Sequence, residues 1–201
     1  MKILNNSLAA VIRIITGVST LPREQIPNHS SLYFSNHTSH LDFLIIWSIL
    51  PHEIREKTSP VAAADYWQAT RLKRWVSKKI FNAVYIQRKG RSSNNIHPLD
   101  NVVNALGNGR NIILFPEGSR SSDGKMKKFK PGLYHLAKMF PDTLLVPLYL
   151  ENLNRILPKG ERLPIPLIGK VYLRKTLQRI PEENKETFLI RAQQAVTLNE
   201  T

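Results

Sequence analysis

Residues 31–50 read SLYFSNHTSHLDFLIIWSIL. The first five form an apolar run of strand length, and Leu41 to Leu50 is an apolar run of helical length that stops before Pro51. Asn36 to Asp42 therefore occupies a crossover from a strand to a helix, where α/β proteins present reactive side chains. Strand-like and helix-like segments alternate along the rest of the chain, which predicts an α/β fold with a mixed, mostly parallel sheet flanked by helices.

His37 and Asp42 stand five residues apart in this crossover. On a loop leading into a helix, the Asp42 carboxylate can turn back onto the imidazole and hold one tautomer, which leaves the other ring nitrogen as a base. Such a base can deprotonate a substrate alcohol, which then attacks an activated acyl group without an acyl-enzyme. Taken alone, the spacing favours a plainer interpretation, in which His37 is a loop histidine and Asp42 caps the helix.

A second motif, PEGSRS at residues 116–121, follows an apolar run over residues 111–115 that has the length of a buried strand. This turn carries one carboxylate, one guanidinium and a glycine that permits unusual backbone angles. The two motifs in this order are far more specific than either one alone. Two further blocks accompany them, FNAVYIQR at residues 81–88 and FKPG at residues 129–132, the latter followed by VPL at residues 146–148.

Asn-His-x-x-x-x-Asp followed by Phe-Pro-Glu-Gly-Ser-Arg resembles the glycerolipid acyltransferases, the family typified by 1-acylglycerol-3-phosphate (lysophosphatidic acid) acyltransferase. The two further blocks are also similar to blocks of that family, so the resemblance covers residues 31–150, the catalytic motif region. Two departures are visible. Ser119 stands where threonine is usual, and the glycine common before the arginine-bearing strand is replaced in the region Lys79 to Asn82.

The resemblance implies a reaction and a set of site residues. A fatty acyl chain would move from acyl-CoA or acyl-carrier protein to the hydroxyl of a lysophospholipid, foremost 1-acylglycerol-3-phosphate, giving phosphatidic acid without a cofactor. His37 would be the base and Asp42 its orienting partner. The implied substrate-binding residues are Arg88, Glu117, Gly118, Ser119, Arg120 and Lys130. Glu117 either accepts a hydrogen bond from a glycerol hydroxyl or braces Arg120. There are two alternatives: an acyltransferase that uses another lysolipid acceptor, and a basic nucleic-acid-binding protein that happens to contain these motifs.

Composition predicts a single domain over residues 1–201 that seeks anionic partners. The chain has 29 Lys and Arg against 15 Asp and Glu, a formal charge of +14. Such a surface suits nucleic acid, an acidic membrane face or phosphorylated substrates, and charge does not choose between them. The absence of cysteine excludes disulfides and thiol catalysis. His37 and His40 lack a third ligand at a recognisable spacing, so we expect no metal site.

Two segments are candidates for contact with a membrane. Residues 1–20 have helical apolar spacing interrupted by Arg13, which predicts an amphipathic helix on either the lipid interface or the protein core, not a spanning helix. Residues 66–80 combine Trp67 and Trp75 with several cations, as helices at anionic lipid surfaces do, although a core-packed or nucleic-acid-binding helix also fits. No nucleic-acid-binding module accompanies them, so we expect a peripheral protein on the cytoplasmic face of an anionic membrane.

The other expected elements follow from apolar runs and from proline and glycine positions. His97 and Asp100 form a second pair, which we interpret as the start of a helix. We expect strands over residues 60–64, 81–88, 143–150 and 170–174, helices over residues 98–106 and 131–140 and from Pro181 onward, and a surface loop over residues 157–167.

Overall fold

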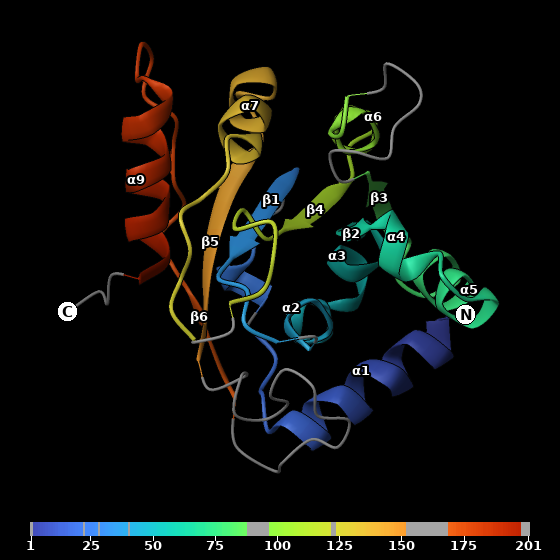
Figure 1. The fold of residues 1–201 in the computed structure, drawn as a ribbon. Helices are drawn as coiled ribbons and strands as arrows, with labels where there is room; N and C mark the ends of the chain where they lie inside the picture. Colours follow the sequence, from blue (N-terminus) through green and yellow to red (C-terminus); the bar gives the residue numbers. More distant parts are fainter. Residues whose placement is uncertain are drawn as a thin grey trace.

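The computed structural model describes residues 2–21, 23–27, 29–39, 41–87, 97–121, 124–151 and 169–197. The strands within these ranges form one six-stranded sheet of order β3-β2-β4-β1-β5-β6 (Figure 1). Their bounds are Ser31–Ser35 (β1), Thr58–Ala63 (β2), Val84–Ile86 (β3), Asn111–Leu114 (β4), Leu144–Glu151 (β5) and Lys170–Leu173 (β6). Every pairing is parallel except that of β5 with the edge strand β6. The predicted mixed, mostly parallel sheet is confirmed.

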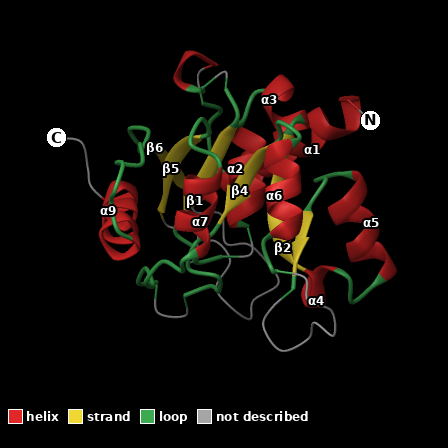
Figure 2. Cartoon of the chain, turned by 90° about the horizontal axis from the view of Figure 1, so that it is seen from above, coloured by secondary structure: helices red, strands yellow, loops and turns green. Residues whose placement is uncertain are grey.

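Helices cover both faces of this sheet (Figures 1 and 2). The longer ones are α1 (Lys2–Thr16), α2 (Asp42–Ile49), α5 (Arg71–Lys79), α6 (Asp100–Gly107), α7 (Gly132–Met139) and α9 (Lys185–Thr197). The shorter ones are α3 (His52–Glu56), α4 (Ala64–Trp67) and a 3₁₀ turn at Arg23–Gln25.

Side chains alternate between two apolar cores because successive strand residues point to opposite faces. Tyr33 of β1 enters the core shared with α1 and α2, where Trp47 is fully buried. Its neighbours Leu32 and Phe34 enter the other core, which α6, α7 and α9 close. Strand β1 is thus central and buried on both faces, and its carboxyl end is held in a fixed position.

The basic segment over residues 66–80 does not form the single helix that its apolar spacing predicts. Helix α4 ends at Trp67, and α5 begins after Thr70, whose hydroxyl accepts a hydrogen bond from the Lys73 backbone N–H at 3.2 Å. Such a capping interaction starts a new helix. Trp67 and Trp75 therefore do not share one helical face.

The final helix also begins later than Pro181 predicts. Glu182 adopts a positive φ of 61°, which ends the first turn, and the Asn184 side chain accepts a hydrogen bond from the Thr187 N–H at 2.9 Å. Asn184 therefore caps α9, which starts at Lys185. The strand expected over residues 81–88 is also shorter in its described part, and the loop expected over residues 157–167 lies outside the described residues.

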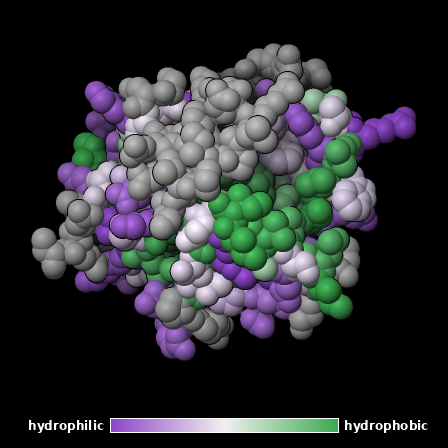
Figure 3. Space-filling view, turned by 90° about the horizontal axis from the view of Figure 1, so that it is seen from below, coloured by the Kyte–Doolittle hydropathy of each residue, from purple (hydrophilic) through white to green (hydrophobic). Residues whose placement is uncertain are grey.

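Helix α1 has apolar side chains on both its inner and its outer surface. Ala9 and Ile12 are buried against the core, whereas Ile3 and Ile14 are 83% and 80% exposed. The Arg13 guanidinium donates to the Ser48 carbonyl oxygen at 2.6 Å and joins α1 to α2. Figure 3 shows hydrophobic side chains gathered on the face seen from below, where α1 lies. Among the described residues, none of the helices is both long and apolar enough to cross a membrane.

Candidate active site

The loop that follows β1 is tied to the neighbouring strand by Asn36. Its buried side-chain amide donates to the Leu150 carbonyl oxygen and accepts from the Leu150 N–H, both at 2.9 Å. The Ser35 hydroxyl donates to the same amide oxygen. This paired contact with β5 fixes the direction in which the chain leaves β1. It also reduces the conformational freedom of the next residue, His37.

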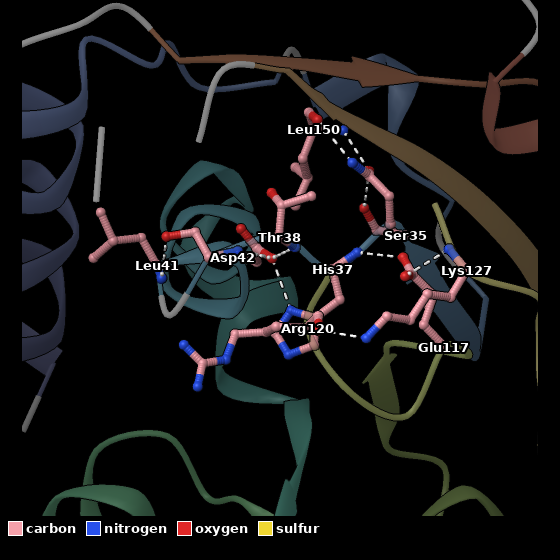
Figure 4. A network of polar contacts seen from close by, with 11 residues as sticks. Ser35, His37, Thr38, Leu41, Asp42, Glu117, Arg120, Lys127 and Leu150 are labelled. Carbon is pink, nitrogen blue, oxygen red and sulfur yellow. Dashed lines mark hydrogen bonds and ion pairs between the residues drawn. The ribbon is translucent and has the colours of Figure 1, made fainter. Parts of the chain in front are cut away.

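The predicted contact between His37 and Asp42 is present (Figure 4). The His37 Nδ1 lies 2.8 Å from the Asp42 Oδ2, and the Asp42 side chain is completely buried at the first turn of α2. The same Oδ2 accepts the backbone N–H groups of Thr38 and Ser39 at 2.7 and 2.9 Å. Because a carboxylate thus placed accepts hydrogen bonds, Nδ1 carries the proton and Nε2 is left as the base.

Phe115, at the end of β4, supports the imidazole from one side. The two rings are stacked with centroids 4.2 Å apart and planes 19° from parallel. Strands β1 and β4 are parallel neighbours, so their carboxyl ends bring His37 and Phe115 together. Phe115 and Asn36 are not among the site residues that the motifs predict. The parallel pairing of the two motif-bearing strands is the signal that predicts the Phe115 contact.

Glu117 binds backbone and does not brace Arg120. Its Oε1 accepts the N–H of His37 at 2.7 Å and its Oε2 accepts the N–H of Lys127 at 2.9 Å. The residue is only 2% exposed, and no hydrogen bond or ion pair joins it to Arg120 within the described parts of the chain. Glu117 therefore holds the histidine loop against the turn that follows β4, and its alternative assignment as an Arg120 partner is wrong.

The turn after β4 places Arg120 beside the histidine. The Ser121 N–H donates to the His37 carbonyl oxygen at 2.8 Å, so the two loops are joined by their backbones. Lys127 reaches the same turn, where its Nζ donates to the Arg120 carbonyl oxygen at 2.6 Å and lies 3.2 Å from the Ser119 hydroxyl. The Arg120 guanidinium has no hydrogen-bonding partner among the described residues, so it is available to a ligand.

Gly118 and Lys130 lie in direct contact. Gly118 has a φ of +69°, and a Cβ built there would come within 2.7 Å of the Lys130 Nζ. The positive φ favours glycine here, whereas the flexible Lys130 side chain could move away from a Cβ. The turn that carries Arg120 also contains Gly118 and Ser119, and Lys130 lies against it. Arg88 lies outside the described residues.

His37 and Arg120 line the same cavity, which has a volume of about 390 Å³. Apolar side chains make much of its wall, among them Phe43, Trp67 and Phe81, which are packed edge to face. Its remaining lining residues include the small side chains of β2 together with Phe115, Tyr66, Ser77 and one carboxylate, that of Asp65. A base and a guanidinium in one cavity that also has aromatic walls can hold a molecule with a phosphate, a hydroxyl and a hydrocarbon portion.

The second His/Asp pair has the structural role expected of it. The Asp100 carboxylate accepts the His97 N–H at 2.9 Å, and α6 begins at Asp100. No group of three or more His, Cys, Asp or Glu side chains suited to a metal occurs in the described ranges, and His40 lies outside them.

Burial raises the pKa of Glu117 above its ordinary value of 4.5, and the N–H groups of Lys127 and His37 oppose that rise. The protonated form is therefore favoured on folding, and its contribution to stability is complete below pH 4.5 and is lost as pH rises through the raised pKa. We expect the free energy of unfolding of the wild type, relative to Glu117→Gln, to fall with rising pH in urea titrations. If the free energy of unfolding of the wild type, relative to Glu117→Gln, instead rose with pH, the two N–H donors would affect the pKa of Glu117 more than burial does.

Comparison with known proteins places this site in a family. The family model described as Acyltransferase matches residues 15–151, which contain all the site residues described above. Mouse 1-acyl-sn-glycerol-3-phosphate acyltransferase alpha is 30% identical over 139 residues, which is 68% of this chain and 45% of the mouse protein. The chloroplastic 1-acyl-sn-glycerol-3-phosphate acyltransferase LPAT1 of Arabidopsis thaliana is 28% identical over 148 residues, covering 73% of this chain and 38% of that protein.

The chain thus spans less than half the length of these two relatives. A solved structure shares the fold. The crystal structure of PlsC, the 1-acyl-sn-glycerophosphate (LPA) acyltransferase of Thermotoga maritima, is similar with a TM-score of 0.73 at 19% identity, over 94% of this chain and 76% of that one. Because the family model matches well over half of its residues, the chain belongs to the acyltransferase family.

Proposed function

We propose that the protein transfers a fatty acyl chain from acyl-CoA or acyl-carrier protein to the hydroxyl of a lysophospholipid. The preferred acceptor is 1-acylglycerol-3-phosphate, which gives phosphatidic acid. One observation carries the proposal: His37, which contacts Asp42, and Arg120, whose guanidinium has no hydrogen-bonding partner among the described residues, line one cavity of mixed polar and apolar character. We also propose that residues 1–201 form one domain, because the two described cores share a single sheet.

In the proposed reaction the acceptor phosphate binds Arg120 and its free hydroxyl donates to the Nε2 of His37. His37 takes the hydroxyl proton as the oxygen attacks the thioester carbonyl, and Asp42 stabilises the resulting imidazolium. The tetrahedral intermediate then collapses and expels the thiolate, which takes the proton from His37. One ester bond forms and one thioester bond breaks, and no covalent acyl-enzyme is needed.

The cations beside the cavity favour an acceptor that bears a phosphate. Arg120 lines it, and Lys127 and Lys130 reach the Arg120 turn from the loop that follows. The relatives named above act on 1-acyl-sn-glycerol-3-phosphate, which supports this choice. The exposed lysines of the same loop are suited to the phosphates of coenzyme A or to an acidic carrier protein.

The function is tested by incubating the purified protein with a panel of lysolipids and with both donor types, and identifying the products by mass. The panel should pair 1-acylglycerol-3-phosphate with its dephosphorylated counterpart and with lysolipids whose phosphate is a diester. We expect phosphatidic acid as the main product. Transfer to the dephosphorylated acceptor at an equal rate would contradict the phosphate assignment. Absence of any acyl product, together with salt-dependent binding to random duplex DNA, would support the nucleic-acid alternative.

Arg120→Ala should raise the acceptor KM by about tenfold to a hundredfold, because a charged hydrogen bond of this kind is worth roughly 1.5 to 3 kcal/mol. The donor KM should change little. We expect the same pattern, but milder, for Arg88→Ala. Steady-state kinetics with each substrate varied in turn provide the measurement, and Arg179→Ala, at a partly exposed arginine that does not line the cavity, is the control. Equal effects on both KM values would make Arg120 a structural residue.

We further propose that the protein works at a membrane surface, because a lysolipid tail remains in or near lipid while its head reaches His37. The outer surface of α1 and that of α5 support this proposal. On α5, Leu72 is 71% exposed and Trp75 is 53% exposed, among the cations Arg71, Lys73, Arg74, Lys78 and Lys79. Exposed apolar side chains between cations are typical of helices at anionic lipid interfaces.

The wild type should therefore co-sediment with vesicles that contain anionic lipid, and binding should weaken with salt. Each lysine or arginine near the surface contributes about 1 kcal/mol. Changing the five α5 cations to glutamine should reduce sedimentation, and deleting residues 1–18 should reduce it independently. Vesicles of neutral lipid are the control. If the wild type stays in the supernatant with anionic vesicles at low salt, the peripheral-membrane proposal fails.

A further inference from the structure

A second cavity, of about 470 Å³, shares one lining residue, Phe81, with the cavity of the candidate active site. Phe81 lines both cavities and is packed edge to face against Phe43 and Trp47, so it forms the wall between them. The second cavity is bounded by α1, α3, the start of β2 and the end of α5. Its lining residues are Asn5, Arg55, Glu56, Thr58, Lys78, Lys79, Ile80, Phe81 and Asn82.

Arg55 is the central cation of this cavity. Arg55 is only 5% exposed, and its guanidinium carbon lies 4.9 Å from the Trp47 ring centroid. It donates to the Leu50 carbonyl oxygen and to the Asn6 side-chain oxygen, while its Nε has no hydrogen-bond partner among the residues that the structure describes. Burial and the neighbouring Arg13 lower the pKa of Arg55, and the nearby carboxylates of Glu56 and Glu53 oppose that fall. No carboxylate forms an ion pair with this arginine in the described parts of the chain.

Other cations surround the same space. Lys78 and Lys79 are exposed at its rim, at the last turn of α5. Behind it, Arg110 lies 2.8 Å from the Asn82 side-chain oxygen, in the amide orientation that satisfies both groups, and burial lowers the pKa of this arginine as well. The one lining carboxylate belongs to Glu56, whose Oε1 lies 3.3 Å from the His52 Nε2. Positive charge is therefore in excess.

Burying a cation is costly even where carboxylates lie near it, as Glu53 and Glu56 do near Arg55, and a bound anion offsets part of that cost. We propose that the cavity between α1, α3 and α5 is a second binding site, for a phosphate group. A phosphate monoester carries about −1.5 to −2 charges, which matches three lining cations against one carboxylate. The volume of about 470 Å³ is large enough for a phosphate together with an organic substituent. Free phosphate compounds and the headgroup of an anionic lipid share this chemistry.

The test uses an Arg120→Ala background, in which phosphate binding at the candidate active site is weakened about tenfold to a hundredfold. Inorganic phosphate is titrated into this protein and the heat of binding is measured. We expect one saturable site. Adding Lys78→Gln and Lys79→Gln should weaken it by at least about tenfold, because two charged donors are lost. Adding Arg71→Gln and Arg74→Gln removes the same charge from the same helix outside the cavity, and should change affinity by less than about twofold.

Two results would overturn the proposal. One is the absence of saturable phosphate binding in the Arg120→Ala protein. The other is equal weakening by both double substitutions, which would assign binding to the general charge of α5. To decide whether the bound phosphate belongs to a lipid headgroup or to a soluble compound, the titration is repeated with glycerol 3-phosphate and with a short-chain phosphatidic acid kept below its micelle concentration. Tighter binding of the second indicates a lipid headgroup, and equal binding indicates a soluble phosphate. Because this readout requires no acyl transfer, its failure is distinguishable from failure of the proposed function.

Discussion

His37→Ala should lower kcat for acyl transfer by about a thousandfold, because general base catalysis typically contributes 10²- to 10⁴-fold. The protein should remain folded. The imidazole is partly exposed and packs mainly against one ring, that of Phe115. Its hydrogen-bonding partner Asp42 keeps two backbone N–H donors when the histidine is removed. The loss should therefore be one of chemistry, with little change in stability.

The measurement is initial velocity at saturating donor and acceptor, with circular dichroism and urea unfolding on the same preparations. His97→Ala is a matched control, because His97 also contacts an aspartate near a helix start but lies outside the cavity. It should retain nearly full turnover. A His37→Ala protein that is folded and keeps more than about a tenth of wild-type turnover would remove His37 from the catalytic assignment.

Asp42→Asn should lower kcat by roughly 10²- to 10⁴-fold, although it changes only one atom. The Oδ2 of Asp42 accepts three hydrogen bonds, two of them from the backbone of the histidine loop. An amide whose nitrogen faces the ring donates to Nδ1. This moves the ring proton to Nε2, and the atom that should take the acceptor's proton then already carries one.

An amide turned the other way keeps the tautomer, but it cannot stabilise the imidazolium as a carboxylate does. Both orientations therefore predict a fall in kcat with a smaller change in either KM. Asp100→Asn, at the start of α6, is the matched control for the loss of a carboxylate at a helix terminus. A folded Asp42→Asn enzyme with near wild-type kcat would show that Asp42 only caps α2, the plainer interpretation of the spacing.

The architecture could be predicted because each strand carries its own apolar run. The segment from Ser31 to Leu50 contains a central strand, a polar crossover and a buried helix within twenty residues, so the parallel class follows from local patterns. The His37–Asp42 contact could be predicted for the same reason, since both ends of it lie in one loop.

Contacts between segments that are distant in the sequence could not be predicted from local patterns. Glu117 binds the backbone of His37 from 80 residues away, and no spacing rule specifies that partner. Arg120 was the more obvious partner because it is near in sequence and of opposite charge. In the structure the buried Glu117 carboxylate accepts hydrogen bonds from the backbone N–H groups of His37 and Lys127 instead.

The helix boundaries differ from the predicted ones because of local capping, which apolar periodicity does not reveal. Apolar spacing continues through residues 66–80, but Thr70 takes an extended conformation and caps α5, which divides the segment. Asn184 acts similarly before α9. In both cases a short polar side chain satisfies backbone N–H groups that a continuous helix would satisfy internally.

Direct transfer from donor to acceptor, with His37 as the base, is most directly tested in a single turnover with an isotopically labelled acyl donor. Enzyme in excess is mixed with the donor, with and without 1-acylglycerol-3-phosphate, and the label is followed by mass spectrometry on lipid and on intact protein. We expect labelled phosphatidic acid only when the acceptor is present, its formation about a thousandfold slower with His37→Ala, and no label on the protein at any time. Label on the protein, or labelled phosphatidic acid formed as fast by His37→Ala as by the wild type, would contradict it.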